Sequence, residues 1–208
     1  MKKIFLYLSS ITLICASCTA DKQQVESCCK VPAGKTAQQA PDSVLPGESL
    51  YNDTDVFTSQ HGKSIQLKDF RGKITVVSMV FTHCTYACPR LTEDIKAIGD
   101  KLQAQEITDV NYVLVSFDTN RDDPERLRAF AAEMGLDKRW TLLQGSEDAV
   151  RQLSVLLNVQ YEKAPDGSFA HSNLITVLDQ QGRVATQLEG LEAGNSETVA
   201  TIQQLAKL

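Results

Sequence analysis

The chain has 208 residues, of which 42% are hydrophobic and 23% charged, a composition typical of a globular domain with one sizeable core. Its formal net charge of −5 excludes the basic surface that a nucleic-acid-binding protein needs. Six cysteines are too few for a small domain held together by disulfides, and no apolar run reaches the roughly 18 residues that span a bilayer.

The first 17 residues have the layout of a secretory signal peptide. Lys2 and Lys3 precede an apolar stretch over residues 4–14, and small residues then lead to Cys18. This arrangement resembles a bacterial lipoprotein signal, in which the cysteine becomes the lipid-bearing first residue of the mature chain. We therefore expect an exported protein that an acylated Cys18 anchors to a membrane surface. The alternative is an ordinary cleaved signal without a lipid.

Residues 18–46 are predicted to form a flexible tether. They contain no aromatic side chain, and Gln, Ala, Ser, Lys, Pro and Gly dominate, so this segment cannot bury enough apolar surface to fold. The folded domain is expected over residues 47–208. Cys28 and Cys29 lie in the tether, where they could pass metal to the domain or pair with a thiol of a partner. A bridge between two adjacent cysteines is the least attractive option.

Beyond the tether, the hydrophobic periodicity predicts alternating strands and helices. Nearly continuous apolar runs indicate strands that are covered on both faces, and amphipathic segments with N-cap residues indicate helices. In chain order, the predicted elements are a turn at 61–63 with a strand at 65–67, a strand at 74–81, a helix at 89–104, a strand at 111–117, a helix opening at the Asp123–Pro124 cap, a helix at 146–157, a hairpin of strands 174–178 and 184–188, and a helix at 195–207. This order predicts an α/β sandwich of thioredoxin-like fold with an N-terminal β-hairpin extension.

Cys84 and Cys88 lie where the first central strand ends and the next helix begins. Ligands of open α/β sheets bind at that edge, and the helix N-terminus should lower the pKa of at least one thiol. Four residues apart, the two sulfurs could close on a metal or on each other. In the predicted fold, His171 faces them from the start of the strand at 174. Two thiolates suit Cu(I) and an imidazole also suits Cu(II), whereas a structural zinc site would want a fourth protein ligand.

Two other classes of thiol protein, the thioredoxin-type oxidoreductases and the peroxiredoxins, fit this sequence less well. Thioredoxin-type oxidoreductases have two residues between their cysteines, where this chain has three, and they have a proline where this chain has His171. Neither cysteine has the full peroxiredoxin pattern, a proline seven residues and a threonine or serine three residues before it: Cys84 has neither, and Cys88 has Thr85 but no proline. Among the other polar residues, His83 is either a structural residue or one that tunes the site, and Asp118 either has a turn or capping role or orients His171 or a partner.

These motifs resemble the Sco/SenC family of copper-binding, thioredoxin-fold proteins that serve assembly of cytochrome c oxidase. The matching stretches are Phe81-Thr82-His83-Cys84-x-x-x-Cys88-Pro89, Val115-Ser116-Phe117-Asp118, Arg121-Asp122-Asp123-Pro124-Glu125, Leu142-Leu143-Gln144-Gly145-Ser146, Val159-Gln160-Tyr161-Glu162-Lys163 and His171-Ser172. The resemblance implies that Cys84, Cys88 and His171 are copper ligands and that Cys84 and Cys88 can cycle as a disulfide. Thr85 and Tyr86 depart from the proline and aspartate that the family often has there.

The sequence therefore predicts an exported, lipid-anchored copper chaperone, expected to be a monomer, that delivers copper to an apo-protein such as an oxidase subunit. The first alternative is a thiol-disulfide oxidoreductase that keeps the cysteines of a partner reduced. The second is a redox or copper sensor. His171 separates the first two hypotheses, because a metal site needs the imidazole and thiol exchange does not.

Overall fold

The computed structural model describes residues 45–191 and 196–207. The predicted signal peptide, Cys18, the tether up to residue 44, Cys28 and Cys29 lie outside the described residues and stay predictions. Within the described ranges, every helix is too short or too polar to cross a bilayer.

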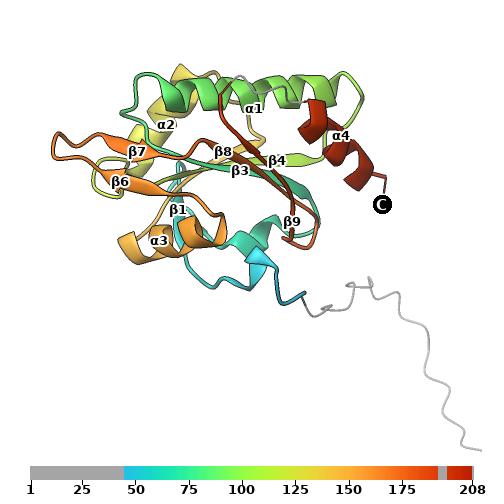
Figure 1. The fold of residues 1–208 in the computed structure, drawn as a ribbon, viewed down its shortest axis with the longest axis horizontal. Helices are drawn as coiled ribbons and strands as arrows, with labels where there is room; N and C mark the ends of the chain where they lie inside the picture. The colour runs from blue at the N-terminus through green and yellow to red at the C-terminus, as the bar shows by residue number, and fades with distance from the viewer. Residues whose placement is uncertain (1–44, 192–195, 208) are drawn as a thin grey trace, which may run out of the picture. The chain divides into compact units, whose positions relative to one another are not determined.

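A seven-stranded sheet forms the centre of the domain (Figure 1). Its order is β2-β1-β5-β4-β3-β8-β9, in which β3, β4 and β5 are parallel and every other neighbouring pair is antiparallel. Every residue of β3 is buried, as expected for a strand covered on both faces. The strands are β1 (Phe57–Ser59), β2 (Ser64–Ile65), β3 (Ile74–Val80), β4 (Val110–Ser116), β5 (Trp140–Gln144), β8 (Leu174–Leu178) and β9 (Val184–Glu189).

Helices cover both faces of this sheet. In Figure 1, α1 (Ala87–Gln103), α2 (Pro124–Glu133) and α4 (Ser196–Leu205) lie on one face, and α3 (Glu147–Leu156) lies on the other with the short 3-10 helices at Leu50–Asn52 and Leu67–Phe70. The apolar stripe predicted for α1 is fully buried: Leu91, Ile95, Ile98 and Leu102 are all 0% exposed. The predicted thioredoxin-like sandwich is thus confirmed for the described residues.

The caps and turns that the sequence predicts are also present. Asp123 accepts a hydrogen bond from the backbone N–H of Arg126 and Ser146 accepts one from Ala149, so both residues cap their helices. The N-terminal hairpin of β1 and β2 turns at Gly62, which has a positive φ of 72°. This hairpin extends the sheet because β1 also pairs with β5.

Three parts of the fold differ from the prediction. The strand predicted at 65–67 ends at Ile65, because Leu67 begins a 3-10 helix. Strand β5 was not predicted, because its short Thr-Leu-Leu-Gln stretch has no clear alternation and its extended form depends on pairing with β4 and β1. Strands β6 (Tyr161–Lys163) and β7 (Phe169–His171) were also missed, and they form a separate two-stranded sheet. Both are only half-buried, so their apolar pattern is weak, although the Asp166–Gly167 turn signal was available.

Gly182, in the turn between β8 and β9, should tolerate no side chain. Its φ is +81°, and a Cβ there would lie 2.6 Å from the ring of Tyr51 and 2.8 Å from Ser49 Oγ. We expect Gly182→Ala to lower the free energy of unfolding by about 3 kcal/mol, from backbone strain and overpacking together. Gly62→Ala is the matched control, because Gly62 has a similar φ with nothing within 4 Å, and it should cost about 1–2 kcal/mol. Urea unfolding measures both, and equal losses would contradict the steric argument.

Candidate metal centre

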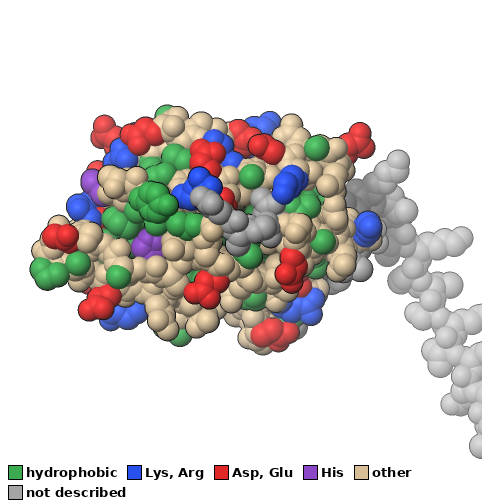
Figure 2. Space-filling view, turned by 45° about the horizontal axis from the view of Figure 1, so that its top comes forward, with side chains coloured by type: hydrophobic (Ala, Val, Ile, Leu, Met, Phe, Trp, Pro, Cys, Tyr) green, Lys and Arg blue, Asp and Glu red, His purple; other side chains and the backbone are tan. Residues whose placement is uncertain are grey.

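An open cleft of about 400 Å³ lies at the end of the domain where β3 gives way to α1. Figure 2 shows hydrophobic side chains gathered beside histidines, with acidic and basic side chains around them. The cleft is lined by residues of the β3–α1 connection and of the β6–β7 hairpin, among them Phe81, His83, Cys84, Tyr86, Phe169 and His171. Two segments that are far apart in the sequence therefore face each other across this cleft.

The two thiols lie at the start of α1. Cys88 is the second residue of that helix, and Cys84 lies in the connection before it. The backbone N–H of Cys88 donates to Cys84 Sγ at 3.3 Å, so this sulfur accepts one of the hydrogen bonds that a helix N-terminus leaves unpaired. Cys88 Sγ in turn accepts the backbone N–H of Phe81 at 3.4 Å. Both cysteines are free thiols.

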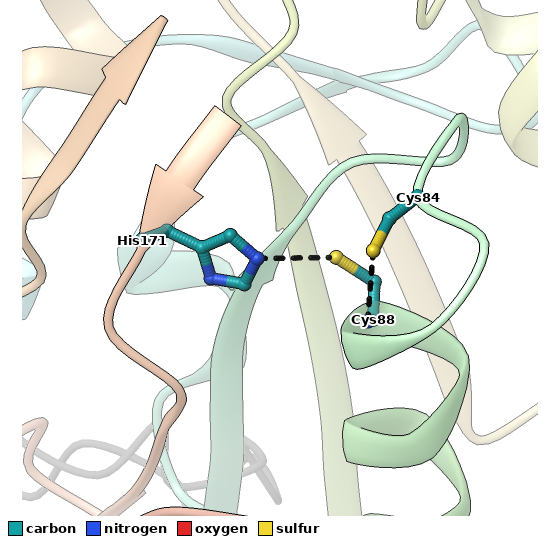
Figure 3. Close-up of side chains that lie close together, drawn as sticks. All are labelled: Cys84, Cys88 and His171. Carbon is teal, nitrogen blue, oxygen red and sulfur yellow. Dashed lines mark hydrogen bonds between the residues drawn. The ribbon is translucent and has the colours of Figure 1, made fainter. Parts of the chain in front are cut away.

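His171 reaches the thiols from the last position of β7 (Figure 3). Its Nε2 lies 3.6 Å from Cys88 Sγ, and its Nδ1 lies 3.1 Å from the carbonyl oxygen of Ser172. Because a carbonyl oxygen only accepts, Nδ1 carries the hydrogen in this arrangement, which leaves the lone pair of Nε2 directed at the sulfur. The ligand atoms of Cys84, Cys88 and His171 all lie within 4.8 Å of one another.

Burial distinguishes the two thiols. Cys88 is 0% exposed, whereas Cys84 is half-buried at the cleft. Burial raises the pKa of the Cys88 thiol well above its ordinary value, the hydrogen bond from Phe81 opposes that shift, and the neighbouring Cys84 adds to it. The sequence predicts a lowered pKa for at least one thiol, and Cys88 is not that one: a helix terminus contributes at most about 2 kcal/mol, which burial of its thiolate exceeds.

Aromatic rings form the wall behind the imidazole. The centroid of the His171 ring lies 5.0 Å from that of Phe117 and 6.0 Å from that of Phe81. Phe169 packs against both of these rings, at 5.0 and 5.1 Å, and Tyr161 stacks on Phe117 at 5.2 Å. These ring contacts hold the imidazole from one side and make that side of the site apolar.

A buried carboxylate holds the loop that leads to Cys84. Asp122 is 0% exposed and accepts hydrogen bonds from the backbone N–H of Thr82 at 2.8 Å, from Thr82 Oγ1 at 2.6 Å and from Ser116 Oγ at 2.6 Å. His83 Nδ1 lies 3.3 Å from the same carboxylate. Arg126 completes the network, since its Nε donates to Thr82 Oγ1 at 2.8 Å. The end of β4 is thereby connected to the residues just before the first thiol.

Asp118 is placed against Arg121 and not against His171. Its carboxylate pairs with Arg121 Nε, and Arg121 donates a second hydrogen bond to the carbonyl oxygen of Gly167 in the β6–β7 turn. The carboxylate therefore reaches the hairpin that carries His171 only through the guanidinium. His61, the third histidine, lies in the exposed β1–β2 turn, as expected.

The structure brings together Cys84, Cys88 and His171, although His171 ends the unpredicted strand β7 and does not begin β8. Sequence reasoning missed the roles of Asp122, Arg121 and Phe117. For the two charged residues a signal was available in the sequence. A run of charged residues directly follows the buried strand predicted at 111–117, and this run begins at the same sheet edge as Cys84. Two thiols and one imidazole are a donor set that fits a soft metal ion.

Comparison with known proteins agrees with this geometry. Residues 48–207 match the model of the SCO1/SenC family. The SCO1 protein homolog of Bacillus subtilis (strain 168) is 28% identical over 140 residues, which are 65% of this chain and 72% of that protein.

Two solved structures have the same fold. The crystal structure of a SCO1/SenC family lipoprotein from Bacillus anthracis str. Ames is 28% identical and superposes with a TM-score of 0.69, covering 74% of this chain and 94% of that one. The structure of Arabidopsis thaliana ScoI with copper bound is 20% identical, with a TM-score of 0.66 and a coverage of 74% and 97%. The family match spans most of the chain, including the cleft with its two thiols and its imidazole, and the chain therefore belongs to the SCO1/SenC family.

Proposed function

We propose that this protein is a copper chaperone, which binds copper through Cys84, Cys88 and His171 and delivers it to an extracytoplasmic target such as a subunit of cytochrome c oxidase. The observation that carries the proposal is the convergence of two thiols and one imidazole within 4.8 Å at an open cleft. The copper-bound structure of the Arabidopsis thaliana relative supports it. Lipidation of Cys18 and export are part of the proposal.

The site has properties that suit capture and release. Copper is the cargo, so it has to reach its ligands and to leave them again. Cys84 borders the cleft and is open to exchange with the thiolates of a partner, whereas Cys88 is enclosed. Because the buried Cys88 thiol is protonated at neutral pH, binding of copper to its sulfur must release a proton, and the affinity should increase as the pH is raised.

A thiol-disulfide oxidoreductase is the second candidate function. One specific observation favours it: both thiols are free, and Cys84 Sγ lies 3.3 Å from the backbone nitrogen of Cys88 at the start of α1. A disulfide could cycle there while the protein reduces the cysteines of a partner. In that reaction His171 has no necessary role.

A variant of His171 separates the two functions. We expect His171→Ala to weaken Cu(I) binding by at least about tenfold, because the imidazole supplies one of three ligands. The exchange of the Cys84–Cys88 pair with a small disulfide should continue. The measurement is a Cu(I) titration of the reduced protein against a competing chelator, beside a thiol-exchange assay. His61→Ala, in the exposed hairpin turn, is the matched control and should bind one equivalent as the parent does. If His171→Ala binds Cu(I) as tightly as His61→Ala, the chaperone proposal fails and the oxidoreductase remains.

A further inference from the structure

A second group of metal-ligand side chains lies beside the first. One ligand atom each from His83, Asp118 and Asp122 lies within 4.8 Å of the other two. None of the three belongs to the Cys84, Cys88 and His171 site. His83 comes from the β3–α1 connection, and both aspartates follow β4, so the end of the parallel sheet brings them together.

Asp118 has a buried oxygen without a partner. The residue is 1% exposed, and Oδ2 pairs with Arg121, but Oδ1 makes no hydrogen bond. A buried acceptor of this kind costs about 1–3 kcal/mol if nothing satisfies it. A bound cation would satisfy it, and this makes the group more than a chance gathering of acids.

His83 and Asp122 already have a spacing that suits a shared ion. His83 Nδ1 lies 3.3 Å from Asp122 Oδ1, close to the separation of two ligands on one cation with metal–ligand distances of about 2.0–2.2 Å. The other contacts of Asp122 fix the direction of its carboxylate, as the surroundings of a metal ligand should. The side chain of His83 is 42% exposed and borders the cleft of the thiol site, so an ion can enter past it.

The local charge favours a divalent cation. The two carboxylates carry two negative charges, and Arg121 neutralises one of them. The guanidinium of Arg126 is bound by Glu133 at 2.8 and 3.1 Å, so its charge is already balanced. One negative charge is left for an entering ion, and no sulfur is in the group. One nitrogen and two carboxylate oxygens suit zinc, cobalt or Cu(II) and disfavour Cu(I).

We propose that His83, Asp118 and Asp122 form a second cation site, which takes a divalent transition-metal ion through nitrogen and oxygen ligands. It adjoins the cleft of the thiol site through His83, and it differs from the thiol site in ligand chemistry. The protein then discriminates between oxidation states, with soft Cu(I) on the sulfurs and a divalent ion on the carboxylates. The second site does not depend on the proposed chaperone function.

Cobalt(II) is the probe, because thiolate ligation adds a strong charge-transfer band to its spectrum and nitrogen–oxygen ligation does not. The experiment titrates the full chain carrying Cys84→Ser and Cys88→Ser together with Cys28→Ser and Cys29→Ser, so that the adjacent thiols at 28 and 29 cannot bind the probe. We expect one equivalent of Co²⁺ to bind with visible d–d absorption and without the thiolate band. His83→Gln and Asp118→Asn, each in this background, should weaken binding by at least about tenfold.

The controls separate this site from the thiol site. His61→Gln and His171→Gln in the same background should retain the cobalt spectrum, and near-ultraviolet circular dichroism verifies that each variant is folded. Absence of the d–d absorption, a spectrum with the thiolate band only, or a spectrum unchanged in His83→Gln would each overturn the proposal. Because Cu(I) binding by the parent chain is measured separately, failure here leaves the chaperone proposal standing, and failure of Cu(I) binding leaves this one standing.

Discussion

Replacing Cys84 by serine is expected to lower the Cu(I) affinity by more than about 100-fold. Loss of a residue that only supports a metal ligand costs about 10–100-fold, and loss of a thiolate, the charged soft ligand that Cu(I) prefers, should cost at least the upper value. Cys84 is the better test of the two thiols, because Cys88 is fully buried and its substitution would also disturb the core. The measurement is the competition titration with reduced protein, at fixed pH.

Thr85→Ser is the matched control for this experiment. Thr85 neighbours Cys84, is exposed and lines the same cleft, so its substitution changes the loop without removing a ligand. We expect its Cu(I) affinity to equal that of the parent. A Cys84→Ser protein that still binds one equivalent tightly would show that copper is held elsewhere in the chain.

The second large effect is expected at Asp122. Asp122→Ala removes the acceptor of three hydrogen bonds and leaves the buried N–H of Thr82 unpaired. Hydrogen bonds to a charged group contribute about 1.5–3 kcal/mol each, and the two hydroxyl groups can turn to other partners. We therefore expect the free energy of unfolding to fall by about 3–5 kcal/mol. Urea denaturation followed by the fluorescence of Trp140 measures it.

Two further variants test whether the loss of stability comes from the hydrogen bonds of Asp122. Asp122→Asn keeps the shape and one acceptor for the N–H of Thr82, so it should cost less than the alanine variant. Glu125→Gln removes an exposed carboxylate three residues later and should stay within about 0.5 kcal/mol of the parent. A loss at Asp122→Ala no larger than that of Glu125→Gln would contradict the role assigned to the buried network.

The parts of the fold and site predicted from the sequence are those with strong local signals. Continuous apolar runs identify β3 and β4, and Asp123 with Pro124 marks the start of α2. The four-residue spacing of Cys84 and Cys88 at a strand–helix junction indicates the site because it brings both thiols to the start of α1. These features depend on neighbours in the chain, which the sequence displays directly.

The rest depends on contacts between distant residues. Strand β5 is extended because it lies between β4 and β1, and the His171 ring is oriented by Phe117 and by the carbonyl of Ser172. The raised pKa of Cys88 follows from how completely the fold covers its sulfur. A sequence predicts that a thiol lies near a helix terminus, but it does not reveal whether burial outweighs the helix dipole.

The imidazole and the thiols lie on parts of the fold that differ in local stability, because His171 belongs to the β6–β7 hairpin. Among the described strands, β7 pairs only with β6, and this two-stranded sheet is not part of the seven-stranded one. Two-stranded hairpins are marginally stable by themselves, so local opening of this segment should cost less free energy than unfolding of the domain. We expect the backbone amides of β7 to exchange hydrogen faster than those of β3. In the proposed copper site, the imidazole is then the ligand expected to detach first, while Cys88 keeps its place on α1 and Cys84 its place in the connection before it.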